Sequence, residues 1–190
     1  AFTSLIVGGG EVDIVGAQTR CDVGGGRLCR EVRQITNEDV SAHVMNDDRA
    51  VVTVPMSPGI WYAFGPDGVS APGLESVRQP LVLAGDLDEV LRYSSEEVPT
   101  YEAMAPSKTL ATFHGAGHYG FSDICALAPF LSDECSGSND GWMDVDDVQS
   151  ISQTITLSHI RYHLFGDVRD APWLAEQWLI DEPMVTVQSE

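Results

Sequence analysis

Two short apolar runs between Pro80 and Gly120 constrain the fold of this chain more than any other feature. Leu81–Ala84 and Thr109–Phe113 have the length and β-branched content of buried strands. Each runs into a glycine-containing turn, and the two turns carry Asp88 and His118. An acid and then a histidine, at the carboxyl ends of successive strands, is the pattern of the last two members of a hydrolase triad in the chain order Ser…Asp…His. This order predicts a serine upstream of both residues.

The order of predicted elements favours an α/β fold with a mostly parallel sheet and flanking helices in a single domain over residues 1–190. Ala50–Val54 is predicted as a further buried strand. Helices are predicted over Asp88–Met104 and Val145–Phe165, the latter ending at Gly166. Because three strands make a poor free-standing sheet, more strands are expected upstream.

Asp88 and His118 are the strongest catalytic candidates because a carboxylate can hold an imidazole in the tautomer that accepts a proton from a nucleophile. Asp86 and Glu89 compete with Asp88 for the acid role, and His114 competes with His118 for the base. The alternative is structural, with Asp88 as a helix N-cap and His118 as a turn residue.

Ser57 is an alternative nucleophile within the chain, since it follows a predicted strand and precedes Asp88 and His118. A nucleophile elbow needs a helix directly after the serine, and Pro58-Gly59 opposes one. We therefore expect this segment to line the acyl pocket, with Ile60 and Trp61 as apolar walls. Trp61 as an ordinary core residue is the competing interpretation.

Charge and cysteine content limit the binding partners and the cellular compartment that we expect for this protein. The net charge of −19, from 10 basic and 29 acidic residues, disfavours binding to nucleic acid or to anionic membranes. No apolar run of about 18 residues is present, so no stable membrane insertion is expected. The pairs Cys21/Cys29 and Cys125/Cys135 predict two short-loop disulfides in a secreted or periplasmic protein whose signal lies upstream. Four unpaired cysteines in a cytosolic chain is the alternative.

Four motifs resemble the C-terminal half of α/β-hydrolases of the dienelactone hydrolase and platelet-activating-factor acetylhydrolase type, which also resemble bacterial polyester hydrolases. They are VPMSPG, PLVLAGDLDEV, FHGAGHYGFSD and DGWMDVDDVQ…RYHLFGD, and the resemblance covers most of Ala50–Trp173. It implies an α/β-hydrolase fold and a cofactor-free serine esterase acting on a small-molecule, lipid or polyester ester. In that family the acid matches Asp88 and the base matches His118.

The first residues extend this resemblance. Ala1-Phe-Thr-Ser-Leu5 is similar to the helix that follows the family's nucleophile elbow, Gly-x-Ser-x-Gly-Ala-x-Thr-x-Leu. The resemblance implies that the serine lies three residues before Ala1, in an N-terminal half with the remaining strands and the first oxyanion-hole amide. Residues 1–190 alone are then expected to be inactive.

A second interpretation is a non-catalytic acidic module that binds calcium. Asn139–Asp147 resembles a calcium loop, with Asp140, Asp144 and Asp147 at ligand positions and poor ligands, Ser136 and Ser138, at the first and third. The aspartates also suit the amino end of the following helix, which we favour. His159 and His163 have the i, i+4 spacing of metal ligands but lack an acidic residue between them, so we expect packing or surface roles and no metal.

Overall fold

The computed structural model describes residues 1–23, 29–30, 33–36, 46–65, 70–128, 141–169 and 184–190. Its elements, in chain order, are α1 (Phe2–Val7), α2 (Ile14–Val23), η1 (Trp61–Phe64), η2 (Pro72–Leu74), β1 (Leu81–Gly85), η3 (Tyr93–Glu97), α5 (Val98–Glu102), β2 (Thr109–Phe113), η4 (His118–Phe121), α6 (Ile124–Leu127), α7 (Val145–Phe165) and β3 (Val185–Ser189). None of the helices within these ranges is both long and apolar enough to cross a membrane.

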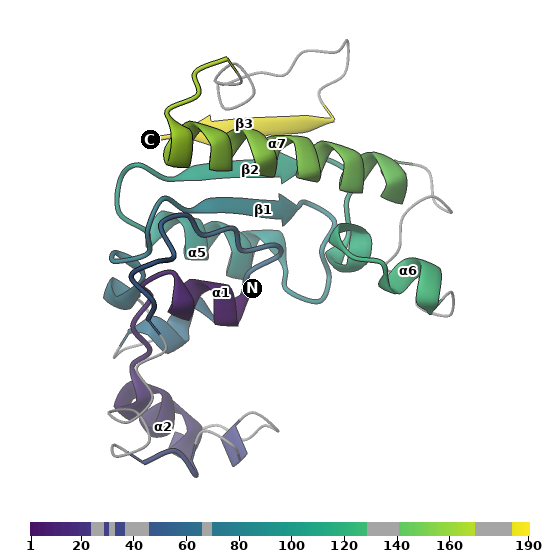
Figure 1. Ribbon diagram of the computed structural model, residues 1–190. Coiled ribbons are helices and arrows are strands. Elements are labelled where there is room, and N and C mark those ends of the chain that lie inside the picture. The colour runs from purple at the N-terminus through teal and green to yellow at the C-terminus, as the bar shows by residue number, and fades with distance from the viewer. Residues whose placement is uncertain (24–28, 31–32, 37–45, 66–69, 129–140, 170–183) are drawn as a thin grey trace.

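A mixed sheet in the order β1-β2-β3 lies between α7 and the helices α1 and α5 (Figure 1). β1 and β2 are parallel, with Leu81 opposite Thr109, and every residue of both strands is buried. Both strands were predicted and are confirmed. β3 was not predicted; it pairs antiparallel with β2, and its burial is uneven because it lies at the edge of the described sheet.

The predicted strand Ala50–Val54 is wrong as a regular strand. The segment runs parallel to β1 but makes only two isolated bridges, Thr53 to Pro80 and Met56 to Leu83. Pro55 and Pro80 lack an amide hydrogen, so a continuous ladder of hydrogen bonds cannot form between the two segments. The backbone still follows β1 as far as Ser57, whose amide donates to the Leu83 carbonyl at 2.8 Å.

Helices cover both faces of the sheet. Leu81, Leu83 and other residues of β1 and β2 pack with Val148 and Ile155 of α7. The alternate residues of the two strands face the opposite side, which α1 and α5 cover (Figure 1). This arrangement gives two apolar cores separated by the sheet, as expected for strands buried on both faces.

The predicted helices fared differently. Val145–Phe165 is confirmed, with Asp144 as the N-cap, its Oδ1 accepting from the Asp146 amide at 2.8 Å, and with left-handed Gly166 as the C-cap (φ 65°). A single helix over Asp88–Met104 is wrong: its first turn is irregular, η3 is one π-helical turn, and only Val98–Glu102 is α-helical.

The disulfide between Cys21 and Cys29 is present as predicted. Cys125 is also disulfide-bonded. Cys135, its predicted partner, lies outside the described residues. No described cysteine is a free thiol.

Candidate functional site

Asp88 and His118 meet at the carboxyl ends of β1 and β2. Asp88 lies three residues beyond the end of β1, and His118 begins η4, five residues beyond the end of β2. The Oδ2 atom of Asp88 lies 2.7 Å from Nδ1 of His118. Parallel pairing of the two strands thus brings together two residues that are 30 positions apart in the sequence.

The surroundings of Asp88 hold its carboxylate in one orientation. Its side chain is completely buried, and its Oδ1 atom accepts hydrogen bonds from the amides of Val90 (2.8 Å) and Leu91 (2.7 Å). Asp88 therefore caps the following turn and orients His118 at once, so the structural and catalytic interpretations of this residue are compatible. A carboxylate that accepts several hydrogen bonds is stabilised in its ionised form.

The His118 ring is oriented as a proton acceptor. An ionised Asp88 can only accept at Oδ2, so Nδ1 of His118 carries a proton and Nε2 carries the lone pair when the ring is neutral. The His118 side chain is 21% exposed, and Nε2 makes no hydrogen bond to any residue that the structure describes. Nε2 is therefore available to a nucleophile or a substrate.

The competing residues form a second Asp–His pair nearby. Nδ1 of His114 lies 2.8 Å from Oδ2 of Asp86, and Nε2 of His114 lies 2.7 Å from Oγ1 of Thr186 on β3. Oδ1 of Asp86 accepts from the Gly115 amide at 2.7 Å. Both ring nitrogens of His114 thus have partners, and the pair joins β3 to the loop after β1. The third competitor, Glu89, is exposed.

A second buried acid lies beside the Asp88–His118 pair. Glu97, the last residue of η3, has no exposed surface, and its Oε2 accepts from the Gly85 amide at 3.1 Å. Burial, together with the negative charge of Asp88, raises the pKa of Glu97 to about 9. The buried Ser57 side chain also adjoins Glu97 and acts to lower its pKa, although the Ser57 hydroxyl has no partner at ordinary hydrogen-bond geometry among the described residues.

Ser57 has no contact with His118 that would activate it. Its hydroxyl is buried and lies next to Glu97, and no helix begins directly after it, since the next helical element, η1, starts at Trp61. The arrangement gives no support to Ser57 as a nucleophile.

Ile60 and Trp61 lie against the segment that follows Asp88. The Ile60 amide donates to Oε2 of Glu96 at 2.7 Å, and Nε1 of Trp61 donates to the Ser95 carbonyl at 3.0 Å. Both side chains also pack partly against the core on the α1 and α5 side of the sheet. The two predicted pocket residues are thus hydrogen-bonded to η3, which follows the acid loop (residues 85–88), and their role as walls of an acyl pocket stays a prediction.

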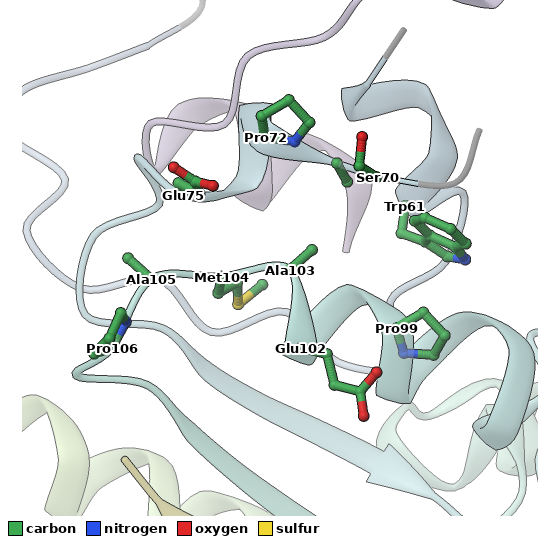
Figure 2. A pocket seen from close by; sticks show the side chains of 11 residues that line it. Trp61, Ser70, Pro72, Glu75, Pro99, Glu102, Ala103, Met104, Ala105 and Pro106 are labelled. Atoms are coloured by element: carbon green, nitrogen blue, oxygen red, sulfur yellow. The ribbon is translucent and has the colours of Figure 1, made fainter. Parts of the chain in front are cut away.

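Figure 2 shows a groove of about 830 Å³ that neither Asp88 nor His118 lines. It runs between η2 and the end of α5. Its lining residues include Trp61 but neither Asp88 nor His118; they are Trp61, Ser70, Ala71, Pro72, Glu75, Pro99, Glu102, Ala103, Met104, Ala105 and Pro106. Trp61 is the one predicted site residue that borders it.

Of the two histidines of α7, His159 packs in the interior of the protein. His159 is completely buried, and its Nε2 donates to the Gln79 carbonyl at 3.0 Å; burial lowers its pKa to about 4. Its ring stacks near that of His163, with centroids 4.3 Å apart. No cluster of three or more potential metal ligands occurs among the residues described. Asp144 caps α7, while Ser136, Ser138, Asn139 and Asp140 of the predicted calcium loop lie outside the described residues.

Comparison with known proteins does not assign this chain to a family. The chain matches no protein-family model, and no curated protein matches it. The function is therefore argued from the geometry of the site and from the motifs in the sequence.

Proposed function

We propose that Asp88 and His118 are the acid and the base of a serine-dependent carboxylic ester hydrolase with an α/β-hydrolase fold. One observation carries the proposal: a buried Asp88 accepts from Nδ1 of His118 while Nε2 remains without a partner among the described residues. This is the arrangement in which an imidazole takes a proton from a nucleophilic hydroxyl. The nucleophile is a serine in the segment upstream of Ala1, as the sequence motifs imply.

The reaction follows from these positions. Nε2 of His118 takes the proton of the serine hydroxyl as its oxygen bonds to the ester carbonyl carbon, and Asp88 stabilises the imidazolium that forms. The imidazolium then gives this proton to the departing alcohol, which leaves an acyl-enzyme. A water molecule, deprotonated by the same Nε2, attacks the acyl carbon, and the imidazolium returns the proton to the serine oxygen as the acid is released. The proposed chemistry uses no cofactor.

Other features support parts of this proposal. The Cys21–Cys29 disulfide fits an oxidising compartment and hence a secreted or periplasmic protein. The net charge of −19 fits an uncharged ester substrate better than a nucleic acid. Ile60 and Trp61 are proposed as apolar walls of the acyl pocket, since hydrogen bonds to Glu96 and Ser95 hold them against η3, which follows the loop that carries Asp88.

Ester turnover by a polypeptide extended upstream of Ala1 tests the proposal. His118→Ala is expected to lower kcat/KM for a p-nitrophenyl ester by about 10⁴-fold, because the base is lost. His114→Ala is the matched control, since it removes the neighbouring histidine whose two nitrogens already have partners. Equal turnover by wild type and His118→Ala would refute the assignment. Labelling with a fluorophosphonate, located by peptide mass spectrometry, identifies the nucleophile; an adduct at Ser57 would show that the upstream serine is not needed.

A further inference from the structure

Glu97 is a fully buried acid that the reaction above does not use. It lies at the end of η3, and its Oε2 atom accepts from the amide of Gly85, the residue that ends β1 and opens the loop to Asp88. Its other oxygen, Oε1, is buried and accepts no hydrogen bond from any described residue. A buried acceptor without a donor is costly, which indicates that Glu97 is not ionised.

The groups around Glu97 decide where the proton lies. Asp88 approaches from the acid loop, the Ser57 hydroxyl from the segment beside β1, and the Gly85 amide from β1 itself. No lysine or arginine forms an ion pair with either acid within the described ranges. Two ionised carboxylates side by side in a buried site repel each other, so one of them holds a proton.

Asp88 is the ionised member of this pair of acids. It accepts three hydrogen bonds, from the amides of Val90 and Leu91 and from Nδ1 of His118. Glu97 accepts one hydrogen bond of ordinary geometry, from Gly85. Hydrogen bonds to a carboxylate favour its charged form, so the proton resides on Glu97. The raised pKa of Glu97, about 9, agrees with this assignment.

We propose that Glu97 is the positioning residue of the Asp88–His118 pair. As a neutral carboxylic acid it donates a hydrogen bond to the Asp88 carboxylate and accepts one from the Gly85 amide, so that both ends of the acid loop are held by one side chain. Its importance for catalysis rests on the proposed function, but the hydrogen bonds themselves do not.

The test uses the 190-residue chain and two substitutions of similar volume. Glu97→Gln keeps an acceptor for Gly85 and a donor for Asp88, whereas Glu97→Leu removes both. The readout is the ¹H NMR resonance of the His118 Nδ1 proton, which is expected to stay downfield and slow to exchange in Glu97→Gln and to broaden or vanish in Glu97→Leu. Glu96→Gln is the matched control, because Glu96 lies on the same turn but accepts from Ile60.

Unchanged His118 Nδ1 resonances in Glu97→Leu would overturn the proposal. A second measurement holds even if Glu97→Leu fails to fold: the ¹³C chemical shift of the Glu97 carboxyl in the wild-type chain. A shift typical of a protonated acid at pH 7, moving only near pH 9, is expected, and an ionised carboxyl at pH 7 would refute the proposal.

Ester turnover in the upstream-extended polypeptide then separates the two proposals. Glu97→Leu is expected to lower kcat by about 10- to 100-fold with little change in KM, and Glu97→Gln to restore most of it. If His118→Ala leaves turnover unchanged while the NMR results hold, the proposed function fails and the positioning role of Glu97 stands. If His118→Ala abolishes turnover but Glu97→Leu leaves kcat at the wild-type value, the positioning role fails instead.

Discussion

Two Asp–His pairs follow the same two strands, and they differ in what surrounds them. In the first, Asp88 is completely buried and its histidine, His118, is 21% exposed. In the second, Asp86 and His114 are 31% and 41% exposed. The carboxylate–imidazole distances are almost equal, 2.7 Å and 2.8 Å. Distance alone therefore does not distinguish a catalytic pair from a structural one.

The second nitrogen of each histidine makes the difference. Nε2 of His114 already bonds the Thr186 hydroxyl at 2.7 Å, which joins the edge strand β3 to the rest of the sheet. Nε2 of His118 has no such partner in the part of the chain that the structure describes. The first pair leaves a base available, and the second uses both nitrogens to hold the fold together.

The largest expected effect is a difference in ester turnover between substitutions of Asp88 and of Asp86. In the upstream-extended polypeptide, Asp88→Asn is expected to lower kcat/KM for an ester by about 10⁴-fold, because an amide favours the wrong histidine tautomer. Asn at this position can still accept from the amides of Val90 and Leu91, so the fold is expected to survive. Asp86→Asn is expected to leave turnover close to wild type. Thermal melting of both variants controls for unfolding.

Comparable losses in the two variants would remove the distinction between the pairs. It would mean that the loop from Gly85 to Asp88 acts as a unit, and that the Asp86–His114 bond is needed to keep Asp88 in place.

Much of this comparison could be predicted from local sequence. The runs Leu81–Ala84 and Thr109–Phe113 are largely apolar, the first lies between Pro80 and Gly85, and the ends of α7 carry strong capping residues, Asp144 and Gly166. Such signals act within a few residues, so pattern and structure agree. The same local signals predicted that Asp88 and His118 follow the ends of neighbouring strands.

The remainder depends on contacts between distant parts of the chain. β3 is short and pairs with β2 across more than 70 positions, so Thr186 could not be linked to His114 in advance. Glu96 and Glu97 are adjacent and chemically alike, yet one bonds the Ile60 amide and the other is completely buried beside Asp88. Only the packing of η3 decides which acid is buried.

The next effect is on the pH dependence of stability. It arises from Glu97, which adjoins the Asp88–His118 pair. Its pKa is raised from an ordinary value of 4.5 to about 9, so between these values the unfolded chain has released a proton that the folded chain keeps. The contribution of Glu97 to stability is then fully present below about pH 4.5 and falls with rising pH by up to about 1.4 kcal/mol per pH unit until the pH passes about 9. Glu97→Gln is expected to remove this decline, as measured by urea unfolding from pH 6.5 to 9.

Two features make this measurement specific. The range starts at pH 6.5 because buried His159, whose pKa is lowered to about 4, reduces stability as the pH falls from 6.5 toward 4. Asp86→Asn is the control, since it removes an acid from the same loop without contacting Glu97, and it should retain the alkaline decline. An unchanged decline in Glu97→Gln would contradict the assignment of the buried proton.

A smaller effect is expected at the structural pair. Thr186→Val removes the hydroxyl that bonds Nε2 of His114 and keeps the side-chain shape, so the free energy of unfolding should fall by about 0.5–1 kcal/mol. Thr186→Ser keeps the hydroxyl and serves as the control in the same urea titration. A Thr186→Val variant as stable as wild type would show that the Thr186–His114 bond contributes nothing to holding β3.

The smallest expected effect is a difference in the reactivity of the two rings. Diethyl pyrocarbonate attacks the lone pair of a neutral imidazole, and in both histidines the partner carboxylate keeps the proton on Nδ1, which leaves the lone pair on Nε2. Exposure alone favours His114, whereas the free lone pair favours His118. We expect His118 to react several-fold faster, as followed by peptide mass spectrometry. Thr186→Val should raise the rate at His114 alone, since it frees that lone pair. Faster modification of His114 in the wild-type chain would mean that access, and not hydrogen bonding, governs these rings, and the comparison between the pairs would lose its chemical basis.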